Sequence, residues 1–149
     1  VKNKKIFILG AGGVVPSIIV ALKKMQALKI ILSNRTREKA EALKNIFKDL
    51  SVLDWGEIVD FDMIINATSL GLKENDKFGT DFTKAGKNKL FYDVIYEPYD
   101  TEFSHAAKIT GNIYENGLNM FLFQAQKAFN IWHDINPIVN DQLIKFLKS

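Results

Sequence analysis

Residues 6–17, with the sequence IFILGAGGVVPS, decide the fold of this chain. Four apolar residues predict a buried strand, three glycines follow within four positions, and a helical pattern begins directly afterwards. This order of strand, glycine turn and helix is the context that a dinucleotide-binding fingerprint requires. Gly10 allows a tight turn, Gly12 leaves space for a pyrophosphate, and Gly13 lets the helix start close to the strand. Val15 departs from the fingerprint, and the alternative is a glycine turn that binds nothing.

The composition excludes several kinds of site. A length of 149 residues suits one core, so we expect one domain over 1–149. Cysteine is absent and there are two histidines, which excludes thiol chemistry and argues against a metal site. The net charge of +3 is spread along helical faces, so we expect no nucleic-acid binding. With no membrane-length apolar run and no signal peptide before the first strand, we expect a cytoplasmic protein without a membrane partner.

The stretch after the second predicted strand bears on the choice of cofactor. Residues 29–33 read as a buried strand, and NRTREK follows at 34–39. Domains that prefer NAD carry an acidic residue near this point, which hydrogen-bonds the ribose 2′-hydroxyl. This chain has Arg35, Thr36 and Arg37 instead, and such groups favour a 2′-phosphate. The sequence therefore predicts NADP. The alternative is that Thr36 only caps the next helix and the arginines are solvated.

Polar residues also follow the strand predicted at 62–67. TSLG comes next, at 68–71. Because ligands bind at the carboxyl edge of a parallel sheet, Asn66 and Thr68 are candidate ligand contacts. The alternative is that both residues only form a turn. The polar stretch 73–86 predicts an irregular surface loop.

The remaining apolar segments complete an alternation of strands and helices. Residues 54–57 are expected to turn the chain, with a brief helix after Asp54 as the alternative, and Pro137 suits the first turn of the last helix. The whole pattern predicts an α/β fold, Rossmann-like and doubly wound, with a mainly parallel sheet of about six strands and flanking helices. Further strands are expected at 51–53, 89–94 and 112–115, and helices at about 13–25, after Thr36, and at 101–110, 117–132 and 138–147.

The last two predicted helices are apolar on more than one side. Met120 and Phe123 extend the apolar surface of the first beyond one stripe, and Ile138 and Ile144 widen that of the second. One sheet cannot bury both sides of a helix, so we expect a second body to cover them. Gln124 is expected to point into that second interface. The same apolar surface predicts self-association of this chain.

Several of these stretches together resemble the C-terminal, NADP-binding domain of shikimate dehydrogenases. They follow the family's order and spacing over nearly the whole chain: Gly10–Gly13, Asn34–Thr36, Asn66–Gly71, Tyr92–Tyr96 with Pro98 and Thr101, and Gly117–Met120 with Gln124 and Ala125. The resemblance implies NADPH-linked reduction of 3-dehydroshikimate to shikimate, a step of aromatic amino-acid biosynthesis. It implies substrate contacts from Tyr96 and Gln124, and cofactor contacts from Gly10, Ala11, Gly12, Gly13, Val14, Asn34, Arg35, Thr36, Lys39, Asn66, Ala67, Thr68, Ser69, Val94, Gly117 and Met120.

The resemblance also implies that part of the active site lies outside this chain. In the family, an N-terminal domain carries the serines that bind the substrate carboxylate and the Lys–Asp pair at the transferring proton. Nothing in this sequence replaces them. We therefore expect no catalytic residue here, and a chain that binds NADP(H) with little or no turnover and shares its small-molecule substrate with that other domain. We assign no role to His105 or His133.

Three alternatives stay open. A quinate/shikimate dehydrogenase and a glutamyl-tRNA reductase have similar nucleotide-binding domains, and the first is expected to tolerate NAD. The segment 117–124 disfavours the reductase, which carries a different C-terminal dimerisation segment. A non-catalytic nucleotide-sensing or partner-binding module is the third, because the catalytic residues are missing.

Overall fold

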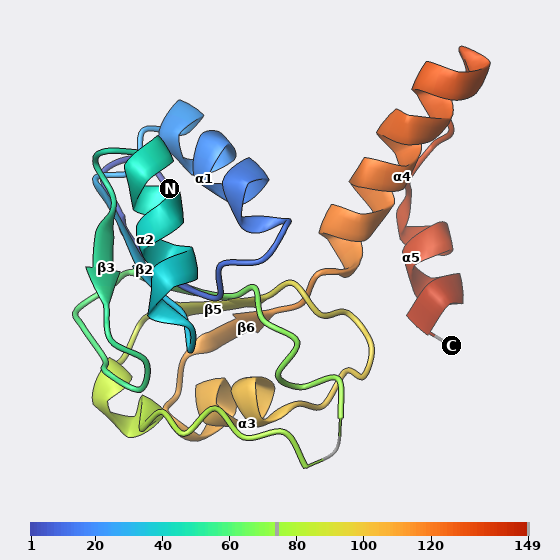
Figure 1. Cartoon of the computed structure of the whole chain (residues 1–149). Helices are drawn as coiled ribbons and strands as arrows, with labels where there is room; N and C mark the ends of the chain where they lie inside the picture. Colours follow the sequence, from blue (N-terminus) through green and yellow to red (C-terminus); the bar gives the residue numbers. More distant parts are fainter. Residues whose placement is uncertain (74, 149) are drawn as a thin grey trace. The chain divides into compact units, whose positions relative to one another are not determined.

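A computed structural model describes residues 1–73 and 75–148, and its strands and helices alternate along the chain (Figure 1). Six strands form one sheet in which all neighbours run parallel, in the order β3-β2-β1-β4-β5-β6. The predicted doubly wound α/β fold is therefore confirmed. The chain divides into two compact units, Val1–Asn116 and a second that begins at Gly117. The first unit contains β1 (Lys5–Leu9), α1 (Val15–Lys24), β2 (Lys29–Ser33), α2 (Arg37–Ile46), β3 (Ser51–Leu53), β4 (Met63–Asn66), the 3-10 helix η1 (Phe82–Ala85), β5 (Leu90–Asp93), α3 (Glu102–Ile109) and β6 (Ile113–Glu115).

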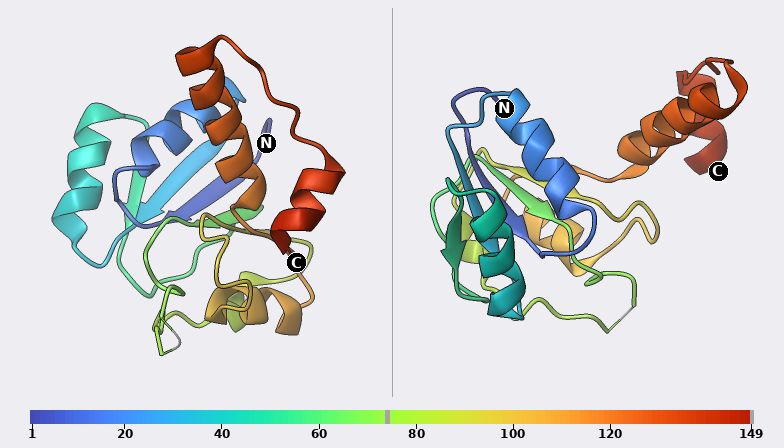
Figure 2. Two further views of the ribbon diagram at one scale, coloured as in Figure 1. Left: turned by 90° about the vertical axis from the view of Figure 1, so that its right-hand side faces the viewer. Right: turned by 45° about the horizontal axis from the view of Figure 1, so that its top comes forward.

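Helices cover both faces of the sheet. Figures 1 and 2 show α1 and α2 on one face and α3 on the other. Successive residues of a strand point to opposite faces, so β1 gives Ile6 and Ile8 to one core and Phe7 and Leu9 to the other. All four are at most 1% exposed. A strand that is buried on both faces needs a continuous apolar run, which explains why this stretch shows no alternation.

The helices α1 and α2 pack their apolar faces on the sheet and begin at its carboxyl edge. α1 turns Val15, Ile19 and Leu22 toward the sheet, and α2 turns Ala40 and Leu43 toward it. This spacing of three and four residues is that of one helical face. Burial of each larger side chain contributes roughly 1.5–3 kcal/mol. Because each helix follows a strand directly, both helices start at the carboxyl edge of the sheet.

The opposite core is built largely from phenylalanine, and it corrects one prediction. An irregular surface loop over 73–86 is wrong from Phe78 onward, because Phe78 is 1% exposed and Phe82 is 5% exposed. Their ring centroids lie 5.6 Å and 5.5 Å from that of Phe103 on α3. These rings stand among polar residues without a helical or strand period, so the sequence pattern did not reveal them. Glu74 of the predicted loop lies outside the described residues.

The turn predicted after Asp54 is confirmed, without the brief helix that was the alternative there. One prediction about the start of a helix is wrong. Pro137 lies ahead of the last helix, α5 (Asp141–Lys148), and not in its first turn. The Oδ1 atom of Asn140 accepts a hydrogen bond from the Leu143 N–H at 2.9 Å. This side-chain cap sets the start of the helix.

The second unit consists of α4 (Leu118–His133) and α5. Within it, Gln126 Nε2 donates to the Pro137 carbonyl at 2.7 Å, which ties the connecting segment to α4. Large apolar side chains are exposed on both helices, Trp132 at 75% among them. The exposed apolar surface predicted on α4 is therefore present, whereas Ile138, predicted to widen that of the last helix, lies ahead of α5. None of the helices in the described residues is long and apolar enough to cross a membrane.

Candidate functional site

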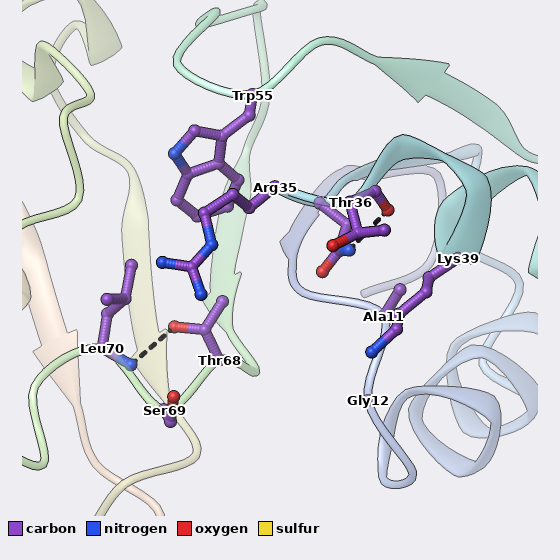
Figure 3. Close-up of a pocket in the computed structure, with 10 residues that line it drawn as sticks. Ala11, Gly12, Arg35, Thr36, Lys39, Trp55, Thr68, Ser69 and Leu70 are labelled. Atoms are coloured by element: carbon purple, nitrogen blue, oxygen red, sulfur yellow. Dashed lines mark hydrogen bonds between the residues drawn. The ribbon is translucent and has the colours of Figure 1, made fainter.

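A pocket opens where four strands end, at the carboxyl edge of the sheet (Figure 3). Parallel strands place the loops that follow them at one edge, so segments far apart in the sequence meet there. All lining residues except Trp55 and Leu70 were predicted cofactor contacts. The pocket is lined by Ala11 and Gly12 after β1, Asn34, Arg35, Thr36 and Lys39 after β2, Trp55 after β3, and Thr68, Ser69 and Leu70 after β4.

The glycine turn after β1 contains one tight position and two open ones. Gly10 has φ +112°, and a Cβ placed there would lie 2.6 Å from the carbonyl oxygen of Ala67, so glycine is required. A Cβ on Gly12 would meet no described atom within 4 Å, which leaves the space above this residue open. The same holds for Gly13. The close approach predicted at Gly13 is therefore wrong, and the close approach occurs at Gly10.

Two cations and one hydroxyl group line the pocket on the β2 side. Arg35 and Lys39 are exposed and form no ion pair with a carboxylate among the described residues. In Figure 3 the Lys39 side chain points toward Ala11, and the Arg35 guanidinium points toward the loop after β4. Thr36 stands at the N-cap of α2, as predicted, but its side chain makes no capping hydrogen bond. Its hydroxyl group is therefore available to a ligand.

Arg37 is engaged away from the pocket. Its guanidinium pairs with Asp54 and, at 3.2 Å, with Glu41 one turn later on α2. Both pairs are exposed, so we expect a small contribution to stability. Of the two arginines that the sequence offered to a 2′-phosphate, Arg35 therefore remains the candidate.

Trp55 is the main lining residue that the sequence analysis missed. Its Nε1–H donates to the Phe78 carbonyl at 3.1 Å, which fixes the indole at the pocket wall. The signal was its position, two residues after β3, because the carboxyl-edge argument applies to this strand as well. Across the same pocket edge, Asn34 Nδ2 donates to the Thr36 carbonyl at 2.7 Å and shapes the turn that carries Arg35.

The wall that follows β4 is held by Asn66, whose side chain is fully buried. Its Nδ2 donates to Asp93 Oδ1 at 2.9 Å and to the Leu70 carbonyl at 3.1 Å. Its Oδ1 accepts from the N–H and the hydroxyl of Thr68, at 3.0 and 2.7 Å. The Leu70 N–H then donates to Thr68 Oγ1 at 3.0 Å. Asn66 and Thr68 both form the turn, and the Asn66 side chain lies beneath the pocket surface. Thr68 also lines the pocket, so its contact with a ligand stays a prediction.

Asp93 is a buried carboxyl group behind this wall. Burial raises its pKa to about 6, against the opposing effect of hydrogen bonds from the Ile95 N–H and from Asn66. Tyr114 on β6 contributes a buried hydroxyl group without a hydrogen-bond partner among the described residues. Burial, followed by the nearby Asp93, raises the pKa of this tyrosine.

The other predicted contacts lie outside the pocket lining. Val94 follows β5, and its N–H donates to the Asn66 carbonyl at 2.9 Å. Tyr96 is 42% exposed. Contacts of these residues with a ligand stay predictions. The predicted residues that do not line the pocket are Gly10, Gly13, Val14, Asn66, Ala67, Val94 and Tyr96 in the first unit, and Gly117, Met120 and Gln124 in the second.

The residues present fit a phosphorylated dinucleotide. Open space lies above Gly12, at the start of α1, where free N–H groups and the helix dipole attract an anion. Arg35, Lys39 and the Thr36 hydroxyl add donors for a second phosphate, and Trp55 offers an apolar face to a base. The lining contains no carboxyl or imidazole group that could move a proton. Within the described residues, no three His, Cys, Asp or Glu side chains gather as a metal site.

Comparisons with known proteins agree with the resemblance seen in the sequence. The model of the shikimate / quinate 5-dehydrogenase family matches residues 1–94. Shikimate dehydrogenase (NADP(+)) of Pelagibacter ubique is 58% identical over 99% of this chain and 56% of its own length. The chain spans about half the length of the curated relatives it matches.

Solved structures give the same result. Shikimate dehydrogenase from Aquifex aeolicus superposes with a TM-score of 0.84 at 38% identity, over 93% of this chain and 51% of its own. Quinate dehydrogenase from Corynebacterium glutamicum in complex with NAD has a TM-score of 0.84 at 26% identity, over 99% of this chain and 56% of its own. The family model matches well over half of the sequence, and the fold agrees along nearly all of it. This chain therefore belongs to the shikimate / quinate 5-dehydrogenase family.

Proposed function

We propose that this chain is the cofactor-binding part of an NADP-dependent shikimate dehydrogenase, which converts 3-dehydroshikimate and NADPH to shikimate and NADP⁺. The observation that carries the proposal is the pairing of open space above Gly12 with Arg35, Thr36 and Lys39 in one pocket. The name and the 58% identity of the Pelagibacter ubique relative support the same assignment.

The pocket residues divide the work of holding the nucleotide. Gly12 and the start of α1 receive the diphosphate, because no side chain blocks the approach and free N–H groups are present. Arg35 offers a planar fork of donors to the 2′-phosphate, Lys39 a point charge, and Thr36 a hydroxyl. A carboxylate would repel this phosphate, and the residues that line the pocket include none.

Hydride transfer requires little from these residues beyond orientation. When bound, NADPH supplies the hydride, while the protein holds it at a fixed distance from the substrate. The pocket lining contains no carboxyl or imidazole group, its one lysine, Lys39, is assigned to the 2′-phosphate, and Asp93, although its pKa lies near 6, is fully buried. We therefore propose that the proton-transfer residues belong to another part of the whole enzyme. This chain alone then binds NADP(H) with little or no turnover.

The substrate contacts proposed from the resemblance are Tyr96 and Gln124. Both side chains are exposed. Tyr96→Phe and Gln124→Ala, introduced into the whole enzyme, should raise KM for the substrate and leave the affinity for NADP⁺ unchanged. Unchanged KM in both variants would remove these two residues from the substrate site.

Calorimetric titration of this chain with NADP⁺ and NAD⁺ tests the proposed function directly. Hydrogen bonds to a charged phosphate contribute about 1.5–3 kcal/mol, so we expect NADP⁺ to bind roughly 10 to 100 times more tightly. Equal or tighter binding of NAD⁺ would overturn the argument from the 2′-phosphate. It would favour the second candidate, an NAD-dependent quinate dehydrogenase, for which the similarity to the Corynebacterium glutamicum structure is the supporting observation.

Binding without catalysis by this chain is expected both of the enzyme's cofactor-binding part and of a non-catalytic nucleotide-binding module, so the activity of a longer form separates the two. A longer form of the protein that includes the preceding coding sequence should reduce 3-dehydroshikimate with NADPH if the enzymatic proposal is correct. A longer form that binds NADP⁺ tightly and reduces neither 3-dehydroshikimate nor the corresponding quinate-series ketone would favour the sensing module.

A further inference from the structure

A buried polar cluster lies behind the pocket wall that follows β4. Asn66 and Asp93 are neighbours in the register of β4 and β5, and both are fully buried. Thr101, at the start of α3, is 4% exposed and donates from Oγ1 to Asp93 Oδ2 at 3.4 Å. Buried polar groups are costly unless each finds a partner, so a cluster of this kind fixes the geometry around it.

The hydrogen bonds of this cluster run outward to the pocket. A carboxylate only accepts hydrogen bonds, so Asp93 requires the amide of Asn66 to face it with Nδ2. The Asn66 oxygen is thereby directed at Thr68, and its second Nδ2 hydrogen at the Leu70 carbonyl. Thr68 and Leu70 both line the pocket. The orientation of one buried amide therefore determines the shape of one pocket wall.

We propose that Asp93 is a positioning residue for the cofactor pocket, acting through Asn66 on the turn that carries Thr68, Ser69 and Leu70. The inference rests on the proposed function of this pocket as a dinucleotide site. The ionised carboxylate is the active form, because a hydrogen bond to a charged acceptor is about twice as strong as one to a neutral acceptor. Protonation of Asp93 weakens its hold on Asn66 and loosens the wall.

The surroundings of Asp93 leave it as the group that titrates in this cluster. β4 presents Asn66, the chain after β5 presents the Ile95 N–H, and α3 presents Thr101. The titratable group that faces it from β6 is Tyr114, which stays neutral below pH 8 because its pKa is raised. The ionisable residues of α3 face elsewhere: Glu102 accepts a hydrogen bond from the Phe78 N–H at 2.9 Å, and His105 and Lys108 lie 3.7 and 3.0 Å from Asp100 at the surface.

Asp93→Asn tests this role while it preserves the shape of the side chain. The amide oxygen still accepts from Asn66, but it carries no charge at any pH. The affinity of the 149-residue chain for NADP⁺ is measured between pH 5 and pH 8 by quenching of the Trp55 fluorescence, in a Trp132→Phe background that removes the other tryptophan. At pH 7.5 we expect the variant to bind about fivefold more weakly than the unsubstituted chain. At pH 5 the two affinities should converge, because burial holds the pKa of Asp93 at about 6.

The ratio of the two affinities is the informative quantity. The 2′-phosphate of NADP⁺ itself titrates near pH 6, and this effect is the same for both proteins and cancels in the ratio. Asp100→Asn is the matched control, since it removes an exposed carboxylate that pairs with Lys108. We expect its ratio to the unsubstituted chain to stay at one throughout.

Each outcome decides between the claims. A ratio that is constant across the pH range, at one or at any other value, overturns the positioning role. If Asp93→Asn does not fold, the test uses the unsubstituted chain with NAD⁺, which lacks the titrating 2′-phosphate. The affinity of the chain for NAD⁺ should fall about fivefold between pH 7.5 and pH 5. An affinity that does not change with pH overturns the positioning role of Asp93. A chain that binds neither nucleotide at any pH overturns the proposed function, and the inference with it.

Discussion

The sequence Asn-x-Thr occurs twice at the carboxyl edge of this sheet, and the side chains of the two copies are hydrogen-bonded differently. In Asn34-Arg35-Thr36, the threonine hydroxyl makes no capping bond and the arginine finds no carboxylate among the described residues. In Asn66-Ala67-Thr68, the asparagine is fully buried and the threonine hydroxyl both donates to Asn66 and accepts from the Leu70 N–H. The first copy has donors available for a ligand, and the second forms a wall.

The neighbouring strands account for this difference. Asn66 ends a central strand, with Asp93 beside it on β5 as a buried acceptor. Asn34 follows β2, and within the described part of the chain its amide donates to the Thr36 carbonyl alone. A polar group that is buried among partners rigidifies the structure, whereas one at a surface without partners is free to bind. Hydrogen-bond accounting therefore separates the scaffold of the pocket from its ligand-binding residues.

The largest effect should come from the contact between the glycine turn and the wall. Gly10→Ala places a Cβ 2.6 Å from the Ala67 oxygen at a φ of +112°. We expect a loss of about 3 kcal/mol in the free energy of unfolding, from backbone strain and overpacking. Gly12→Ala is the control. It should change the free energy of unfolding by no more than about 0.5 kcal/mol and weaken the binding of both NADP⁺ and NAD⁺. Urea unfolding measures the first effect, and equal stability of the two variants would contradict the close approach at Gly10.

The second effect is a pH dependence of the free energy of unfolding, which arises from Asp93 behind the pocket wall that follows β4. The folded-state pKa of Asp93 is raised from 3.8 to about 6, so the folded protein binds more protons than the unfolded chain between these values. Stability contributed by Asp93 is therefore complete below pH 4 and is lost as the pH rises through 6, by about 3 kcal/mol.

Asp93→Asn removes this dependence, so the variant should gain stability relative to the unsubstituted chain as the pH rises from 4 to 7. Comparison of the two proteins by urea unfolding at each pH also cancels the opposite contributions of surface carboxylates such as Asp60, whose pKa Lys5 lowers. Parallel stability curves would show that folding does not raise the pKa of Asp93. A variant that is more stable at pH 7 yet binds NADP⁺ less tightly would separate positioning from folding.

The third effect concerns the first copy, Asn34-Arg35-Thr36, whose side chains are available to a ligand. Arg35→Ala should weaken NADP⁺ binding roughly 10- to 100-fold and leave NAD⁺ nearly unchanged, because only the 2′-phosphate loses its charged partner. Arg37→Ala is the matched control, since this arginine is engaged with Asp54 and Glu41. Calorimetric titration of both variants with both nucleotides measures the effect. A larger loss in Arg37→Ala would mean that ligand binding draws Arg37 out of its ion pairs.

The sequence predicted the strands and the pocket edge well, because their signals are local. The apolar run at 6–9, the glycines after it and the basic turn at 34–36 each identify their role within a few residues. The sheet order then follows from the alternation of strands and right-handed crossovers. Together with the contacts that the family resemblance implied, this placed eight of the ten lining residues at one edge.

What the sequence could not reveal depends on contacts between distant residues. Phe78 and Phe82 are buried only because they meet Phe103 on α3. The engagement of Arg37 depends on Asp54, and the burial of Asn66 depends on Asp93, 27 residues later. No local pattern distinguishes a threonine hydroxyl that is bonded from one that is not. For this reason the two Asn-x-Thr copies were given the same role from sequence.

The smallest expected effect compares these two threonines by the same substitution. Thr36→Val removes a hydroxyl without a capping bond, so stability should change little, while NADP⁺ binding weakens about fivefold through loss of one hydrogen bond to the phosphate. Thr68→Val instead leaves Asn66 Oδ1 and the Leu70 N–H short of a partner, and should cost about 1–3 kcal/mol of stability. Thr36→Ser and Thr68→Ser keep the hydroxyl groups and should restore both properties. Unfolding curves and NADP⁺ titrations of the four variants measure the contrast. If Thr36→Val lost stability and kept its affinity for NADP⁺, the first copy would have a structural role like the second, because the Thr36 hydroxyl would then be hydrogen-bonded within the protein.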